Sequence, residues 1–145
     1  MSDTSNSVTV QTIVSAPLET VWNCWTSPEH IQEWNAASDD WHTTHVTNDL
    51  RVGGTFSARM EARDQSVGFD FSGTYTEVIP HEKIAYILAD NRKVEITFVA
   101  TDDGVHITEI FDTEQENSAE MQRTGWQAIL DSFKHHTENV ANTTS

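Results

Sequence analysis

The sequence predicts an α+β domain: a curved antiparallel sheet of six to seven strands around a long C-terminal helix, with two short helices after the first strand. Three observations lead to this prediction. A chain of 145 residues favours a single hydrophobic core. Strand-like segments follow one another through residues 41–111, and an apolar stripe with helical spacing comes after them. We therefore expect one domain over residues 8–140, with flexible tails at residues 1–7 and 141–145, where Ser, Thr and Asn are abundant.

The N-terminal part of the domain is predicted to form one strand and two short helices. Residues 8–11 alternate between Val and a polar side chain, which is typical of a strand that residues 15–17 then end. One apolar helical face follows at i, i+3, i+4 and i+7, made of Leu18, Val21, Trp22 and Trp25. Ser27 as N-cap and Pro28 as first helical residue indicate a second short helix.

A meander of six strands is predicted next. The expected strands cover residues 41–46, 56–62, 69–79, 84–88, 94–98 and 105–111. The Asp-Asp-Gly sequence at residues 102–104 is a strong hairpin signal between the last two. Such a meander presents one apolar face, which only the long helix is large enough to cover, while the two short helices fill an open end of the sheet.

The last predicted element is a helix from Asn117 to Val140. Asn117 and Glu120 have the spacing of a capping box. The apolar stripe consists of Trp126, Ile129, Leu130, Phe133 and Val140. Gly125 costs roughly 1 kcal/mol against alanine in mid-helix. We interpret this glycine either as a close approach of helix and sheet or as volume left for a pocket.

The charge balance argues against two classes of partner. The chain has 23 acidic and 8 basic residues, a net charge of −15. Such a surface repels phosphate backbones and anionic membranes, so we expect neither nucleic acid nor a membrane as partner. Cys24 is the only cysteine. With no signal peptide or membrane-spanning segment expected, this usage indicates a reducing, cytoplasmic compartment.

Four motifs, in order along the chain, resemble one branch of the SRPBCC (START-like, helix-grip) superfamily. They are SAPLETVW at residues 15–22, NDLRVGGTF at 48–56, GTYTEVIP at 73–80 and TGW leading into Ile-Leu at 124–130. This branch is related to the activator of the 90-kDa heat-shock chaperone ATPase. The resemblance covers residues 8–140 and implies a helix-grip fold with a cavity. The superfamily includes polyketide cyclases, lipid-transfer domains and plant hormone receptors, which share the cavity but not a chemistry.

We expect aromatic side chains to line this cavity, because a strongly bent sheet around one helix leaves volume between them. The predicted ligand-binding residues are Trp34, Trp41, Phe56, Met60, Phe71, Tyr75, Phe98, Glu109, Trp126 and Leu130. For most of them an ordinary filled core is the alternative interpretation.

Glu109 is the main polar candidate for this site. It shares the inward phase of the last predicted strand with Val105, Ile107 and Phe111, although Ile110 would allow a bulge that turns it outward. A buried carboxylate has a raised pKa and could act as an acid or hydrogen-bond a ligand. Glu77 has the same two alternatives, with a surface salt bridge as the outward one.

Signatures of other chemistry are missing. The sequence has no G-x-S-x-G, P-loop or G-x-G-x-x-G motif, so no cofactor is expected. Cys24, between two tryptophans, is interpreted as a buried structural thiol. His135 and His136 diverge on a helix, and His42 and His45 point to opposite faces of a strand, so no metal site is expected.

Three functional hypotheses remain open from the sequence. The leading one is a protein that sequesters or carries a small hydrophobic or amphipathic ligand. The second is a polyketide cyclase- or hydrolase-like enzyme that uses Glu109 and Tyr75 as acid–base groups. The third is a chaperone-interacting module that makes contact through its surface.

Overall fold

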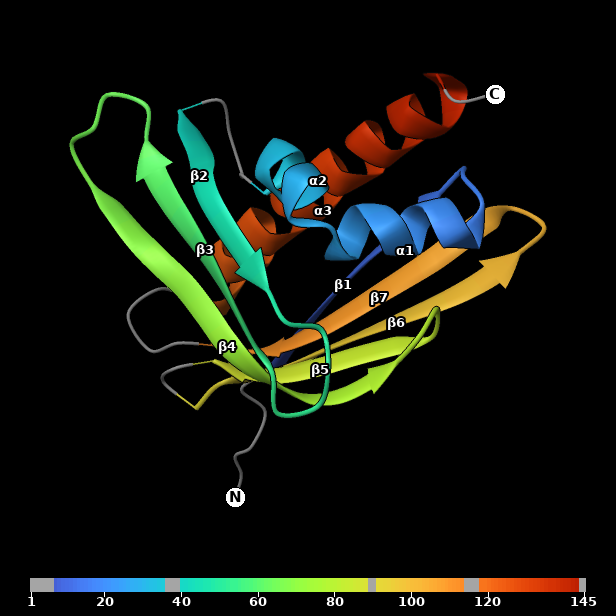
Figure 1. Ribbon diagram of the computed structural model, residues 1–145, viewed down its shortest axis with the longest axis horizontal. Helices are drawn as coiled ribbons and strands as arrows, with labels where there is room; N and C mark the ends of the chain where they lie inside the picture. Colours follow the sequence, from blue (N-terminus) through green and yellow to red (C-terminus); the bar gives the residue numbers. More distant parts are fainter. Residues whose placement is uncertain (1–6, 36–39, 89–90, 114–117, 144–145) are drawn as a thin grey trace.

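The computed structural model describes residues 7–35, 40–88, 91–113 and 118–143. A seven-stranded antiparallel sheet curls around the C-terminal helix (Figure 1). The strands are β1 (Ser7–Val14), β2 (Trp41–Asn48), β3 (Thr55–Ala62), β4 (Gly68–Ile79), β5 (Lys83–Leu88), β6 (Lys93–Thr101) and β7 (Gly104–Asp112). The helices are α1 (Leu18–Thr26), α2 (Pro28–Trp34) and α3 (Ala119–Thr143). The predicted fold class and order of elements are confirmed.

The strand order is β1-β7-β6-β5-β4-β3-β2, so the meander has β2 at one edge and the N-terminal strand at the other. Two register shifts interrupt the ladders, one between Thr43 and His45 in β2 and one between Tyr75 and Glu77 in β4. Because such irregularities bend a strand and increase its twist, they favour the curl of this half of the sheet.

The shift in β4 also decides the orientation of Glu77. Without it, Tyr75 and Glu77 would face the same side, since side chains alternate along a strand. Tyr75 is buried, whereas the Glu77 carboxylate lies 2.9 Å from the Lys83 ammonium group at the surface. Of the two alternatives for Glu77, the salt bridge is confirmed.

The three helices cover the concave side of the sheet. The helix α3 runs along this side, and α1 and α2 lie next to it over the open side of the curl (Figure 1). Polar contacts attach α3 to the edge strand β1: Lys134 donates to the Ile13 carbonyl at 2.8 Å and Gln127 to the Gln11 carbonyl at 3.1 Å. Phe133 is fully buried, with its ring edge-on to Trp25 and Trp34.

The helix ends differ in detail from the prediction. Asn117 lies outside the described residues, and the Ser118 hydroxyl accepts a hydrogen bond from the Met121 amide at 3.1 Å, the geometry of an N-cap. Pro28 is the first residue of α2, as predicted, but the Ser27 hydroxyl donates to the Asn23 side chain instead of capping α2. The helix α3 continues to Thr143, three residues beyond its predicted end. The rest of the predicted tails, residues 1–6 and 144–145, lies outside the described chain.

Gly125 does not mark a close contact. A Cβ atom built on it would meet nothing within 4 Å. The interpretation as a tight approach of helix and sheet is therefore wrong, because such an approach needs a neighbouring atom in the space of the missing methyl group. Open space surrounds this face of α3 at Gly125.

Candidate ligand cavity

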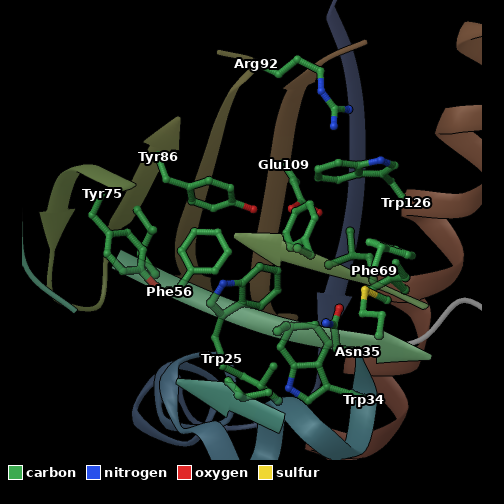
Figure 2. A pocket seen from close by; sticks show the side chains of 18 residues that line it. Trp25, Trp34, Asn35, Phe56, Phe69, Tyr75, Tyr86, Arg92, Glu109 and Trp126 are labelled. Carbon is green, nitrogen blue, oxygen red and sulfur yellow. The ribbon is translucent and has the colours of Figure 1, made fainter. Parts of the chain in front are cut away.

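A cavity of about 310 Å³ lies between the concave face of the sheet and the helices (Figure 2). Most of its lining is apolar or aromatic, and the lining residues come from all three helices and from β2, β3, β4, β5 and β7. They are Trp25, Ile31, Trp34, Asn35, Val46, Phe56, Ala58, Met60, Phe69, Phe71, Tyr75, Ile84, Tyr86, Arg92, Glu109, Trp126, Ile129 and Leu130.

Eight of the ten predicted ligand-binding residues line this cavity: Trp34, Phe56, Met60, Phe71, Tyr75, Glu109, Trp126 and Leu130. Trp41 and Phe98 do not. The Trp41 ring packs edge-on against Phe69, itself a lining residue, with 5.8 Å between ring centres. The Phe98 side chain points inward from β6, as expected. However, α1 covers this part of β6 and separates Phe98 from the cavity. Its ring contacts those of Trp22 and Trp25, each at 5.5 Å between centres.

Part of the cavity lining was not predicted from the sequence, for two different reasons. Tyr86 alternates with Ile84 and Leu88 on β5, so its inward orientation could have been predicted from the same pattern that placed Phe56. Asn35 and Arg92 lie outside helices and strands, where periodicity gives no information about side-chain direction.

Glu109 faces inward, with 6% of its surface exposed. The β7 pairings of Val10 with Glu109 and of Ile96 with Glu109 belong to ladders without a register shift, so no bulge turns the side chain outward. Ile110 instead points to the outer face. Burial raises the pKa of the Glu109 carboxyl from 4.5 to about 8. Within the described chain this carboxyl makes no hydrogen bond, and at neutral pH it is mostly protonated.

Tyr86 and Arg92 supply further polarity around Glu109. The Tyr86 hydroxyl points toward Glu109 in Figure 2, and Arg92 lies near Trp126 at one end of the cavity. Burial, with a smaller contribution from Glu109, raises the pKa of Tyr86 well above its ordinary value, while the charge of Arg92 acts in the opposite direction. Among the described lining residues, Arg92 is the one cationic side chain.

Tyr75 is engaged in a structural chain of hydrogen bonds. Its hydroxyl donates to the Asn48 side-chain oxygen at 2.5 Å, and the Asn48 amide nitrogen donates to the Thr26 carbonyl at 2.7 Å. Burial raises the pKa of Tyr75, so the hydroxyl keeps its proton. This chain connects β4, β2 and the end of α1.

Trp126 forms the α3 side of the cavity wall. Its indole ring stacks on Phe111 of β7, with 3.9 Å between ring centres and 8° between ring planes. It also lies edge-on to Phe71 of β4, with 6.2 Å between centres. Trp126 thus packs α3 against two strands that are not neighbours in the sheet.

A curled seven-stranded sheet around a C-terminal helix, with two short helices after the first strand, defines the helix-grip class of the SRPBCC superfamily. Within it, the chain belongs to the family described as activator of Hsp90 ATPase homolog 1-like proteins, whose sequence model matches residues 15–138. The resemblance inferred from the four motifs is confirmed.

Solved structures agree with this assignment. The chain is 40% identical to the AHSA1-like protein from Aeromonas hydrophila, with a TM-score of 0.88 over 92% of this chain and 93% of that one. It is 45% identical to Chr148 from Cytophaga hutchinsonii, with a TM-score of 0.81 over 97% and 98% of the two chains. NE0264 from Nitrosomonas europaea shares the fold, with a TM-score of 0.80 at 19% identity over 92% and 95%. The comparison with curated proteins gave no match.

Among the described residues, no helix combines the length and the apolar character needed to cross a membrane.

Proposed function

We propose that this protein binds a small, mainly apolar molecule with a hydrogen-bond acceptor in the cavity between the sheet and α3. The observation that supports this most is Glu109. Glu109 presents a mostly protonated carboxyl group to an otherwise mainly apolar cavity, and the described chain supplies no acceptor for its proton, so this group is available to donate a hydrogen bond to a ligand oxygen or nitrogen.

The size and lining of the cavity narrow the class of ligand. A volume of about 310 Å³ is at the lower end of the range for ligand pockets, roughly 300–1,000 Å³. This size favours a compact aromatic or short-chain compound over a two-chain lipid. The many ring edges and faces favour an aromatic ligand, and the neutral Glu109 favours a carbonyl or ether oxygen on it.

The two other hypotheses have less support. The fold is consistent with a ligand-binding or a chaperone-related module. The cavity inside the domain favours the ligand-binding role. For a chaperone role, this protein would have to stimulate the ATP turnover of Hsp90. An enzyme using Glu109 and Tyr75 lacks a free second group, because the Tyr75 hydroxyl is held by Asn48.

We propose neither nucleic acid nor a membrane surface as a partner. Both are negatively charged, and a net charge of −15 would repel them. A cytoplasmic location fits the free, buried thiol of Cys24.

Filling the cavity tests the proposal. Ala58 lines the cavity and is buried on β3, so the Ala58→Leu variant places three more carbon atoms into the space. An apolar fluorescent probe should bind the native protein with micromolar affinity, about −8 kcal/mol. We expect Ala58→Leu to weaken this binding at least tenfold while the circular dichroism spectrum is kept.

The matched control is Ala100→Leu, the same change at an exposed position of β6. Its probe affinity should equal that of the native protein. A native protein that binds no probe, or an Ala58→Leu variant that binds it equally well, would contradict the proposal.

A further inference from the structure

Three side chains with metal-binding atoms meet between the helices, apart from the cavity. Cys24 lies on α1, His30 on α2 and His136 on α3. Their ligand atoms, one from each residue, all lie within 4.8 Å of one another. The closest contact joins His30 Nδ1 and His136 Nε2 at 3.0 Å.

The surroundings of this group leave one polar atom unsatisfied. The Thr137 hydroxyl on α3 is a neighbour of the Cys24 thiol. Thr137 is fully buried, and its hydroxyl makes no hydrogen bond of ordinary geometry with the described residues. Buried hydroxyl groups are rarely left this way. A thiolate at Cys24 or a metal-bound water would give this hydroxyl a strong acceptor.

We propose that Cys24, His30 and His136 bind a divalent transition-metal ion of the zinc type. Zinc binds nitrogen at about 2.0–2.1 Å and sulfur at about 2.3 Å, so tetrahedral ligand atoms lie about 3.3–3.6 Å apart. The His30 and His136 nitrogens, 3.0 Å apart, are near this spacing, and all three ligand atoms lie within 4.8 Å of one another, so the ion would have to draw the group together by no more than about 1.5 Å. A thiolate with two imidazoles selects zinc over magnesium or calcium, which prefer oxygen ligands.

Binding of the ion replaces a proton and a hydrogen bond by metal–ligand bonds. The Cys24 thiol releases its proton to solvent, and the hydrogen bond between His30 and His136 is replaced by two nitrogen–metal bonds. Both imidazoles are half-buried, so the ion can reach them from solvent, while Cys24 closes the inner side. Three protein ligands leave a fourth position for water.

The proposed ion would connect the helical wall of the ligand cavity. Trp25 follows Cys24 on α1 and Ile31 follows His30 on α2, and both line the cavity. Trp34 also lines it, and its indole nitrogen donates to the Cys24 carbonyl at 2.9 Å. An ion bound to all three helices would hold this wall in place.

Nothing in the sequence pattern indicates this group of three side chains. Sequence spacing reveals metal sites when the ligands lie a few residues apart, whereas His30 and His136 are separated by 106 residues. The expectation of no metal site rested on nearby pairs such as His135 with His136, and the proposal replaces it.

Metal titration of the chelator-treated, full-length protein tests the site. With Co²⁺, the native protein should develop a thiolate-to-cobalt charge-transfer absorption, which Cys24→Ser should lack. With Zn²⁺ at about one hundred times its dissociation constant, the melting temperature should rise by roughly 5–10 °C. His136→Ala, at a half-buried position that tolerates truncation better than Cys24, should bind Zn²⁺ at least tenfold more weakly.

The matched control is His135→Ala, since His135 is adjacent but exposed and outside the group. It should keep the native zinc affinity and the cobalt absorption. The proposal is overturned if the native protein with Co²⁺ shows no charge-transfer absorption. It is also overturned if His136→Ala binds Zn²⁺ as tightly as the native protein, because surface histidines would then hold the ion.

Discussion

Glu109→Gln is expected to make the protein more stable, by an amount that grows as the pH rises from about 5 to 8. Glutamine has nearly the same shape as a protonated glutamate but cannot ionise. In the native protein, burial raises the pKa of Glu109 from 4.5 to about 8, so the folded state keeps a proton that the unfolded chain has already lost.

This retained proton decides how the free energy of unfolding of the native protein changes with pH. Below pH 4.5 Glu109 is protonated in both states, and it has no effect on the pH dependence of stability. Between 4.5 and about 8, unfolding releases the proton, and the free energy of unfolding falls by up to about 1.4 kcal/mol per pH unit. Above pH 8, the free energy of unfolding of Glu109→Gln should exceed that of the native protein by about 4–5 kcal/mol at most.

Urea unfolding of both proteins at a series of pH values measures this difference. Glu82→Gln is the control, because it removes the same charge at an exposed position. Its stability should follow the native curve at a nearly constant offset. Parallel curves for Glu109→Gln and the native protein would show that the Glu109 carboxyl is not held in its neutral form.

Trp126→Ala is expected to lower the free energy of unfolding by about 3 kcal/mol and to weaken binding of the apolar probe at least fivefold. The stability loss comes from the apolar surface of the indole and its stack on Phe111 at 3.9 Å. The binding loss has a separate cause, since Trp126 forms part of the cavity wall.

Trp22→Ala separates these two effects. Trp22 is also half-buried on a helix and lies edge-on to Phe98, but it does not line the cavity. This variant should lose a similar amount of stability in urea unfolding and keep the native probe affinity. Equal losses of affinity in both variants would mean that binding reports only general stability and not the cavity.

The fold could be predicted from the sequence because its signals are local. Alternation on β3 and β5, the turn at residues 102–104 and Pro28 at the start of α2 each depend on neighbours in the chain. The inward phase of Glu109 was one of two alternatives, and the unbroken register with β1 and β6 decided between them.

The parts of the site that the sequence did not predict depend on tertiary contacts. Phe98 has the correct phase, yet α1 covers it, and nothing local to β6 indicates where α1 lies. The register shift beside Tyr75 that turned Glu77 outward has no clear signal in its own residues. Arg92 enters the lining from a loop, where periodicity gives no information.

If a ligand enters the cavity between the sheet and α3, the indole N–H signals of the five tryptophans should report its position. A small aromatic ketone would be titrated into ¹⁵N-labelled protein and followed by two-dimensional NMR. Trp25, Trp34 and Trp126 line the cavity, whereas Trp22 and Trp41 do not. We expect saturable shifts of the three lining signals, with the other two nearly unchanged. Shifts confined to Trp22 or Trp41, or no shift at saturating ketone, would contradict it.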